Sequence, residues 1–280
     1  MTNEVKIVNF KIMDFTEQQL ERYSRHILLQ DVGVQGQGKI MQGRVLIIGA
    51  GGLGSPAALY LAASGVGTIG IVDPDKVELS NLQRQIIHFT QDIHLPKASS
   101  AARKMQALNP DITVKAYHEP VRAGNIGRII RDYDFVIDGT DNFAAKFLIN
   151  DACVMAGIPF SHGGILGFAG QTLTVLPGRS ACYRCVFRAP PPPGAVPSCA
   201  QAGVLGAVAG MLGTIQTVEA LKFLLGLGTL LTDTLLVFDA FTMEFSKLSF
   251  KKNPDCPLCG AHPSIVELFD GKPPVCDKEV

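Results

Sequence analysis

The sequence predicts an α/β fold, a Rossmann-like, doubly wound sheet that is mostly parallel and is extended by antiparallel strands. Three features of the 280 residues lead to this prediction. Short apolar strands alternate with helix-forming stretches from residue 44 onward, which is typical of βαβ units. A glycine loop directly follows the first of these strands, as in nucleotide-binding folds. After Pro159, shorter segments alternate apolar and polar residues, which favours antiparallel pairing.

Each element is expected from its own pattern. Thr16 with Gln19 has the form of a capping box, and the apolar spacing after it predicts a helix over residues 16–30 ahead of the sheet. In the parallel part, the expected strands are 44–49, 68–72, 112–118 and 134–138, and the expected helices are 53–64, 96–108, 124–131 and 142–157. The antiparallel extension is expected from strands at 170–176, 235–239 and 243–249.

Composition narrows the class of protein. With 47% hydrophobic residues the chain can bury a large core, and we expect one main domain with appendages. Lys plus Arg and Asp plus Glu both number 25, so no net charge recruits nucleic acid or an anionic membrane. The first fifteen residues lack the continuous apolar run of a signal peptide, which predicts a cytoplasmic protein. The uncharged stretch 202–218 is too short and too rich in glycine for a membrane span, and it predicts a buried helix of small residues.

The stretch IIGAGGLGS, residues 47–55, predicts a nucleotide site. Gly49, Gly51 and Gly54 let the backbone approach a phosphate closely and direct the first N–H groups of the following helix toward it. Asp73 lies nineteen residues beyond Gly54, at the end of the second strand, where an acid can accept hydrogen bonds from both ribose hydroxyls. These features alone leave open whether the ligand is a nicotinamide cofactor or a nucleoside triphosphate.

The residues that follow Asp73 favour phosphate chemistry over hydride transfer. The segment DPDKVELSNLQRQIIHF contains Asn81, Gln83 and Arg84, and Lys97 opens the next helix. A nicotinamide ring needs an apolar face, whereas these side chains are donors suited to several phosphate oxygens. Each cation alone would be interpreted as a solvated surface residue, but together with the glycine loop they favour a phosphate site.

A second acid follows the apolar strand that ends in DGTDN, residues 138–142. The carboxyl ends of parallel strands meet at one edge of the sheet, where ligands bind. Asp141 can hold Mg²⁺ there, or it can cap the next helix. The two roles are compatible, and we favour the positioning of metal and substrate.

Four of the seven cysteines form two CxxC pairs, Cys182 with Cys185 and Cys256 with Cys259. In a cytoplasmic chain this spacing favours a Cys₄ zinc site over two redox pairs. Because sulfur fills all four positions, we expect the zinc to be structural and to join two distant segments.

Cys199 lies between a proline run and the small-residue stretch, in SCAQAGVLG. A lone cysteine is usually inert, but a helix N-terminus directly after it would lower the pKa of its thiol. The sequence therefore leaves Cys199 either as a bystander or as a nucleophile on a loop.

Several motifs together resemble one family. They are RYSRHILL at 22–29, GAGGLG, LSNLQRQ at 79–85, DGTDN, CYRC, the cysteine of SCAQAGV, FDA at 238–240 and CPLCG. Their order over about residues 16–260 is similar to that of the MoeB/ThiF/HesA family, the bacterial relatives of ubiquitin-activating enzymes. The resemblance divides the chain into a lead (1–15), a ThiF/MoeB-type adenylation domain (16–260) and a tail (261–280).

The resemblance implies an adenylyltransferase that works as a homodimer. Members of the family use Mg-ATP to adenylate the C-terminal glycine carboxylate of a ubiquitin-like sulfur carrier of the MoaD or ThiS type, ahead of thiocarboxylate formation. Matched motif by motif, the nucleotide residues are Gly49, Gly51, Gly52 and Gly54 in the loop, Asp73 at the ribose, Asn81, Arg84 and Lys97 at the phosphates, and Asp141 at the magnesium and acyl end. Arg25 resembles an arginine of the family that extends into the active site of the partner subunit. The CxxC cysteines match the family's zinc ligands, and Cys199 matches a cysteine that some members use covalently.

The sulfur donor and the acceptor carboxylate stay open at this stage. Only twenty-odd residues follow Cys259, so we expect no rhodanese domain and a sulfurtransferase or cysteine desulfurase as the sulfur donor, or a relay through Cys199. The carrier could serve molybdopterin, thiamine or another pathway. Two alternatives are adenylation of a peptide and adenylation of a modified tRNA. The neutral net charge counts against the tRNA. An NAD-dependent oxidoreductase and a non-catalytic zinc scaffold are the remaining rivals.

Overall fold

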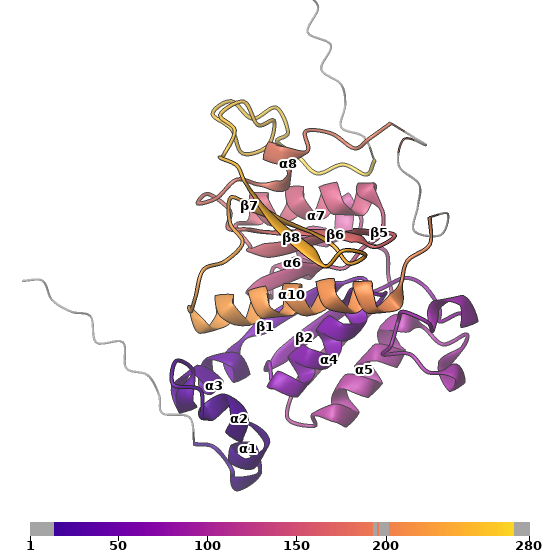
Figure 1. Cartoon of the computed structure of the whole chain (residues 1–280), viewed down its shortest axis with the longest axis vertical. Coiled ribbons are helices and arrows are strands. Elements are labelled where there is room, and N and C mark those ends of the chain that lie inside the picture. The colour runs from indigo at the N-terminus through magenta and orange to yellow at the C-terminus, as the bar shows by residue number, and fades with distance from the viewer. Residues whose placement is uncertain (1–13, 193–194, 196–201, 272–280) are drawn as a thin grey trace, which may run out of the picture.

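One eight-stranded sheet organises the computed structural model, which describes residues 14–192, 195 and 202–271 (Figure 1). The strands are β1 (Arg44–Ile48), β2 (Thr68–Val72), β3 (Thr113–Tyr117), β4 (Phe135–Asp138), β5 (Phe160–Leu166), β6 (Ala169–Val175), β7 (Thr234–Asp239) and β8 (Glu244–Ser249). Their order across the sheet is β3-β2-β1-β4-β5-β6-β7-β8. Pairings from β3 to β5 are parallel and those from β5 to β8 are antiparallel, which confirms the predicted fold class.

The direction of strand addition reverses between β1 and β4. The chain places β2 and β3 on one side of β1 and then crosses to place β4 on the other, so Ile48 lies in register with both Val72 and Asp138. Open α/β sheets bind ligands at the carboxyl ends of the strands at such a reversal. Two segments leave the sheet here: residues 49–54, called the glycine loop, and residues 138–142, called the acid turn.

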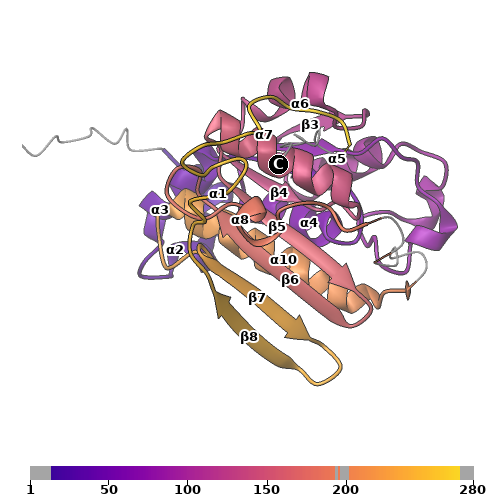
Figure 2. The same ribbon diagram turned by 90° about the horizontal axis from the view of Figure 1, so that it is seen from above.

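Helices cover both faces of the parallel part. One face carries α4 (Gly54–Ser64), α5 (Lys97–Leu108) and α10 (Gly206–Leu225), and the other carries α6 (Ala123–Ile130) and α7 (Phe143–Ala156) (Figures 1 and 2). Val45 and Ile47 of β1 belong to the core beneath α4 and α5, whereas Leu46 and Ile48 belong to the core beneath α6 and α7. Because alternate residues enter two buried cores, the inner strands β1, β2 and β4 are mostly apolar, whereas the edge strand β3 is largely exposed.

Strand β5 is absent from the sequence expectations. Its segment FSHGGIL carries two glycines and a histidine, and it has no regular alternation. It pairs in parallel with β4 and antiparallel with β6, and so joins the two halves of the sheet. The expected strands of the extension are confirmed as β6, β7 and β8. Strand β8 forms the exposed edge, and Figure 2 shows the β7–β8 hairpin extending past the helices.

The N-terminal helix expected over residues 16–30 is broken. The structure has α1 (Glu17–Arg22) and α2 (Ser24–Ile27), followed by α3 (Gly33–Gln42). Helix α3 was not predicted, because its sequence is rich in glycine. The capping box of Thr16 and Gln19 is confirmed. The break falls at Tyr23, whose buried ring lies against Gly65 and whose hydroxyl accepts a hydrogen bond from Asn109 Nδ2 at 2.8 Å. The chain turns where this ring enters the core.

The small-residue stretch forms the first part of α10. This helix is the one element among the described residues that is long and apolar enough to cross a membrane by length and composition alone. Here it packs against α4 and β5. A Cβ atom on Gly213 would lie 2.3 Å from Leu53 O, and one on Gly206 would lie 2.2 Å from Gln83 O. The glycines of α10 therefore let this helix approach the glycine loop closely.

Candidate nucleotide site and cysteine cluster

Close backbone packing requires the glycines of the glycine loop. Gly49 has φ +100°, and a Cβ atom there would lie 2.7 Å from Gly139 O of the acid turn. A Cβ atom on Gly54 would lie 1.8 Å from Gly49 O. Gly52 faces α10, with Ala209 Cβ 3.1 Å from the position of its missing methyl group. Helix α4 starts at Gly54 without a side-chain cap, and an uncapped N-terminus is suited to an anion.

Asp73 holds the glycine loop from the end of β2. It is buried, its Oδ2 accepts a hydrogen bond from Ala50 N at 2.8 Å, and its Oδ1 accepts one from Asp75 N at 2.9 Å. Burial raises the pKa of Asp73, and the nearby Lys97 ammonium opposes that shift. Each carboxylate oxygen keeps a second lone pair, so the side chain can still accept hydrogen bonds from a ribose.

His88 is a loop-holding residue that the sequence reasoning missed. Its Nε2 lies 3.0 Å from Ala50 O and its Nδ1 lies 2.9 Å from Ser100 Oγ. Burial lowers the pKa of His88, so the ring is neutral near pH 7. Ala50 is thus held through its N–H by Asp73 and through its carbonyl by His88. His88 belongs to the polar segment after Asp73, but a single histidine in sequence is indistinguishable from a core residue.

The predicted phosphate ligands have different surroundings. Lys97 is not a solvated surface cation: its side chain is 8% exposed, and Nζ donates to Asp75 Oδ2 at 3.2 Å. Arg84 is half-buried, donates to Ser80 O at 3.0 Å, and lies over Gly52. Asn81 is buried and accepts a hydrogen bond from Glu78 N, so it also stabilises its own turn.

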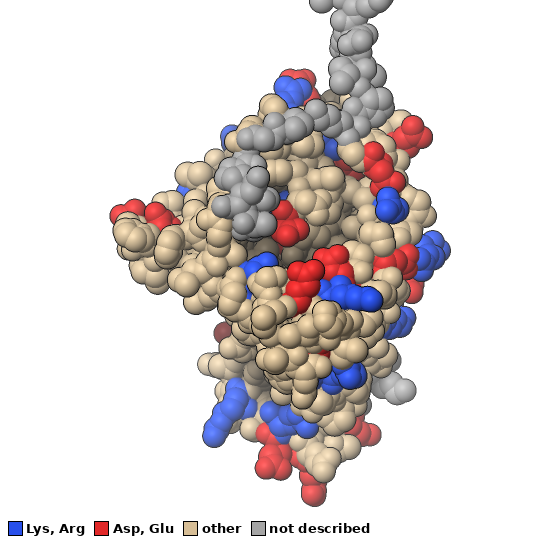
Figure 3. Space-filling model, turned by 90° about the vertical axis from the view of Figure 1, so that its right-hand side faces the viewer, with Lys and Arg blue, Asp and Glu red and all other residues tan. Residues whose placement is uncertain are grey.

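These residues lie at the edge of the sheet where the parallel strands end. Figure 3 shows this side of the molecule, on which acidic and basic side chains lie next to one another around a hollow. A surface that carries both signs of charge suits a polyanion bound together with a cation better than it suits an anion alone.

The acid turn lies directly against the glycine loop. A Cβ atom on Gly139 would lie 3.1 Å from Gly49 O and 3.2 Å from Gly54 N. Asp141 is exposed, and its side chain makes no hydrogen bond or ion pair within the described residues. The alternative role of Asp141 as a helix cap is wrong, because Asn142 is the N-cap of α7 and its Oδ1 accepts a hydrogen bond from Ala145 N at 2.9 Å. The carboxylate of Asp141 is therefore free for a ligand.

Asp138, the first acid of the acid turn, is another residue that the sequence analysis did not predict as part of the site. It is 1% exposed, with Lys146 Nζ 3.2 Å and His162 Nδ1 3.0 Å from its Oδ2. Burial alone would raise the pKa of Asp138, but Lys146 and His162 lower it to about 2. This carboxylate is therefore ionised inside the protein.

The four CxxC cysteines converge as predicted. Their sulfur atoms all lie within 4.8 Å of one another, and the hydrogen-bonded pairs are 3.4–3.9 Å apart. Four thiolates around zinc at about 2.3 Å stand about 3.8 Å apart, so the cluster fits a tetrahedral ion. Cys182 is the N-cap of α8 (Tyr183–Val186) and Cys185 lies in that helix, whereas Cys256 and Cys259 follow β8.

The residues between the first two cysteines are buried. Tyr183 packs against His162 in a tilted arrangement, with ring centroids 4.4 Å apart. Arg184 is fully buried and forms a bidentate ion pair with Asp151 of α7, with both nitrogen–oxygen distances at 2.7 Å. The cysteine cluster is thus joined to α7 and, through His162, to Asp138 of the acid turn.

Comparison with known proteins identifies the family. The sequence profile of the ThiF family matches residues 23–258, which is most of the chain. The chain belongs to the ThiF family. This membership confirms the resemblance seen in the motifs.

Several known proteins are 44–48% identical in sequence to this chain. It is 48% identical over 242 residues to the SAMP-activating enzyme E1 of Haloferax volcanii, covering 86% of this chain and 89% of that protein. It is 45% identical over 263 residues to the sulfur carrier protein adenylyltransferase of Thermus thermophilus, covering 92% and 97%. It is 44% identical over 259 residues to the probable adenylyltransferase/sulfurtransferase MoeZ of Mycobacterium tuberculosis, covering 91% of this chain and 64% of that one.

Solved structures show the same fold at low identity. E. coli MccB superposes with a TM-score of 0.78 at 21% identity, covering 90% of this chain and 75% of MccB. PaaA superposes with a TM-score of 0.73 at 23% identity, covering 89% and 78%. At these identities the likeness concerns the fold alone.

The structure does not place two of the residues matched to the ThiF family at this site. Arg25 is exposed on α2, next to His26, whose Nδ1 lies 3.0 Å from Gln37 Oε1. Gln37 in turn donates to Ser64 O at the C-terminal end of α4. Helix α4 is about 16 Å long and the glycine loop is at its other end, so the structure does not bring Arg25 to its own chain's loop. Cys199 lies outside the described residues.

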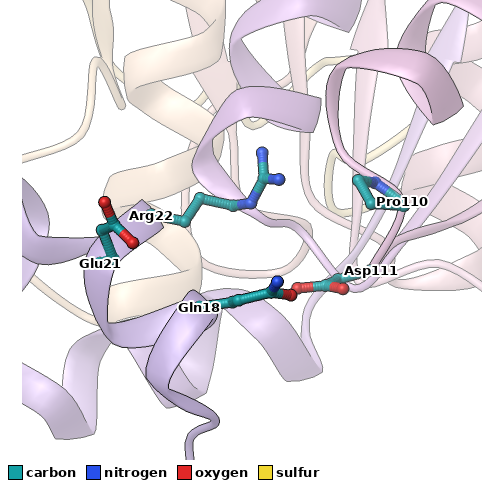
Figure 4. A pocket seen from close by; sticks show the side chains of 5 residues that line it. All are labelled: Gln18, Glu21, Arg22, Pro110 and Asp111. Carbon is teal, nitrogen blue, oxygen red and sulfur yellow. The ribbon is translucent and has the colours of Figure 1, made fainter.

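A hollow of about 540 Å³ lies far from the glycine loop, between α1 and the turn before β3 (Figure 4). It is lined by Gln18, Glu21, Arg22, Pro110 and Asp111. Two of its walls are tied together, since Arg22 donates to Leu108 O at 3.0 Å. Of its lining residues, Arg22 belongs to the RYSRHILL motif, and none belongs to the glycine loop or the acid turn.

Proposed function

We propose that this chain adenylates the C-terminal glycine carboxylate of a small ubiquitin-like sulfur-carrier protein with Mg-ATP. The products are an acyl adenylate and pyrophosphate, and a thiocarboxylate forms in the next step. The observation that carries the proposal is the contact of the acid turn with the glycine loop, Gly139 on Gly49, at the reversal of the sheet. The sulfur-carrier substrate is supported by the similarity to the sulfur carrier protein adenylyltransferase of Thermus thermophilus, which is 45% identical and 97% covered.

ATP is bound by parts that the fold places side by side. The backbone of the glycine loop approaches the phosphates, and Asp73 accepts hydrogen bonds from the ribose hydroxyls. Lys97 exchanges the exposed carboxylate of Asp75 for a phosphate oxygen, because a polyanion attracts its ammonium more strongly than a solvated acid does. Arg84, which lies over Gly52, contacts the phosphates from the side of α10.

The transfer needs charge stabilisation and no protein base. A carboxylate oxygen of the carrier attacks the α-phosphorus, the bond to the bridging oxygen breaks, and pyrophosphate leaves with that electron pair. Arg84 and Lys97 stabilise the negative charge that spreads over the phosphate oxygens. Mg²⁺ adds a further positive charge when bound. The carboxylate of Asp141, which has no partner among the residues that the structure describes, fits it by donor type.

The cysteine cluster holds structural Zn²⁺ in this proposal. Four sulfur ligands leave no open position for a substrate, so the ion contributes to folding and not to the transfer. Its protein surroundings support that role, because Tyr183 and Arg184 between the first two ligands are buried against α7 and β5.

A homodimer completes the proposed site. Arg25 is exposed at the far end of α4 and has no hydrogen bond or ion pair within the described residues, so it is available to a second chain. Sulfur reaches the acyl adenylate from a sulfurtransferase or cysteine desulfurase, either directly or through Cys199. We place these reactions in the cytoplasm.

Exchange of labelled pyrophosphate into ATP tests the substrate. The purified chain with a MoaD- or ThiS-type carrier that ends in Gly-Gly should catalyse exchange, whereas the same carrier without its last glycine should not. Exchange that proceeds equally with the truncated carrier, or only with an unrelated peptide or a modified tRNA, would contradict the proposed substrate.

A further inference from the structure

A buried polar cluster lies beneath the acid turn and includes none of the residues assigned to adenylation. It consists of Asp138 at the end of β4, Lys146 in α7 and His162 in β5. Their side chains are 1%, 7% and 2% exposed. Ionised groups are costly to bury, so a cluster of this kind needs an explanation beyond filling space.

Lys146 ties three elements to one ammonium group. Its Nζ donates to Asp138 Oδ2 at 3.2 Å, to Thr140 O at 2.7 Å and to Gly163 O of β5. An ammonium group has three protons, and these three acceptors use all of them. Lys146 therefore has no donor left for a substrate and can act on the reaction only through its neighbours.

Thr140 is the residue of the turn that this cluster fixes most completely. Its N and Oγ1 both donate to Asp138 Oδ1, at 3.0 and 2.6 Å, and its carbonyl accepts from Lys146. Every polar atom of Thr140 is thus bound to the Asp138–Lys146 pair. Asp141 follows directly in the chain, and its side chain is exposed.

The remaining charges of the cluster are balanced. Burial lowers the pKa of His162, so the ring is neutral and the ammonium of Lys146 compensates the Asp138 carboxylate. A neutral cluster beneath the turn leaves Asp141 as the free negative charge at its surface. The position of that charge then depends on the backbone of residues 139–141.

We propose that Lys146 is a positioning residue that fixes the acid turn so that Asp141 is held in place for magnesium and the acyl phosphate. The inference rests on the proposed function, because the role of Asp141 does. The geometry that carries it is the convergence of Asp138 Oδ2, Thr140 O and Gly163 O on one buried ammonium group.

The test compares Lys146→Met with Lys146→Arg and with a matched control, Lys104→Met. Lys104 also pairs with a buried carboxylate, that of Asp92, but on α5 and outside the acid turn. Amide hydrogen exchange of residues 139–145 is measured in the free chain, and the Mg²⁺ dependence of pyrophosphate exchange is measured with the carrier.

We expect Lys146→Met to speed amide exchange in this segment about tenfold or more, to raise the Mg²⁺ concentration for half-maximal activity, and to lower turnover about 10²-fold, as misplacement of a reacting group does. Lys146→Arg should recover part of each loss. Lys104→Met should leave amide exchange of residues 139–145 unchanged, because Lys104 contacts Asp92 and Ser100 and not the acid turn. A folded Lys146→Met chain with wild-type amide exchange and Mg²⁺ dependence would overturn the inference.

A second variant keeps the test decisive if Lys146→Met does not fold. Thr140→Val removes only the Oγ1 bond to Asp138 and should cause smaller changes in the same direction. Unchanged amide exchange and Mg²⁺ dependence in that variant would also overturn the inference. If the wild-type chain shows no carrier-dependent exchange, the proposed function fails, while amide exchange still decides whether Lys146 fixes the turn.

Discussion

Individual side chains at the carboxyl edge of the sheet show what sequence reasoning finds and what it misses. Lys97 and Arg84 were predicted from motif spacing, and the structure places both near the glycine loop. Asp138 and His88 were not predicted, because their roles depend on partners far away in sequence: His162 for Asp138 and Ala50 for His88. Spacing within a motif is enough to predict residues such as Lys97 and Arg84. Residues such as Asp138 and His88 are recognised only from their tertiary contacts.

The buried carboxylate of Asp138 predicts an acid-sensitive contribution to stability. Its pKa is lowered to about 2 in the folded chain, below its ordinary value, so the stabilisation is present above about pH 4 and is lost as the pH falls through about 2. We expect Asp138→Asn to reduce the free energy of unfolding at pH 7 by about 3 kcal/mol, because it leaves Lys146 buried without its charge partner.

Urea unfolding from pH 7 down to pH 2 measures this contribution. The difference in free energy of unfolding between wild type and Asp138→Asn should shrink as the pH approaches 2. A difference that stays constant over this range would show that the charge of Asp138 does not stabilise the fold.

The helices and strands were largely predictable because most follow a clear period. The inner parallel strands β1, β2 and β4 are mostly apolar, and α4, α5, α6 and α7 fall within about two residues of their expected bounds. The failures have local causes. Strand β5 is specified by pairing with β4 and β6 and not by its own pattern, and the N-terminal helix breaks where Tyr23 enters the core.

Two glycine-to-alanine changes, one in the glycine loop and one in α6, should have opposite effects on stability. Gly54→Ala would place a methyl group 1.8 Å from Gly49 O, so we expect a loss of about 1–3 kcal/mol in the free energy of unfolding together with weaker ATP binding. Gly124→Ala in α6 meets no atom within 4 Å and should stabilise the chain by up to about 1 kcal/mol. Equal stability and ATP affinity in both variants would contradict the packing described for the loop.

The molecule as a whole is held together by contacts between distant segments. The cysteine cluster joins the segment before α8 to the segment after β8, and it reaches the acid turn through Tyr183 and His162. The two CxxC motifs were visible in sequence, but the docking of the residues between them was not, because Arg184 reads as a surface cation until its buried partner Asp151 is known.

Metal removal should affect stability across the molecule. We expect one zinc ion per chain, and Cys182→Ser should lose metal and stability together, because a closed Cys₄ site contributes directly to folding. Cys153→Ala is the control, since Cys153 is buried in α7 and is not one of the four clustered cysteines, so its variant should keep the metal. Metal analysis that finds no zinc in freshly purified wild-type protein would contradict the assignment.

If Arg25 of each chain serves the site of the partner subunit, two inactive variants should complement each other. Arg25→Ala and Asp141→Ala chains should each be inactive alone, and their mixture should regain activity through hybrid dimers with one intact composite site. Pyrophosphate exchange measured after confirmed subunit mixing tests this. Failure to recover activity in such hybrids would show that Arg25 does not serve the partner's site.

The central claim is that the acid turn and the glycine loop form one adenylation site, and carrier-dependent pyrophosphate exchange by Asp141→Ala tests it most directly. The control is Asp132→Ala, which removes an exposed acid from the turn before β4, at the opposite edge of the sheet. The account predicts that Asp141→Ala stays folded and loses exchange, while Asp132→Ala keeps the wild-type rate. A folded Asp141→Ala chain with full exchange activity would contradict the account.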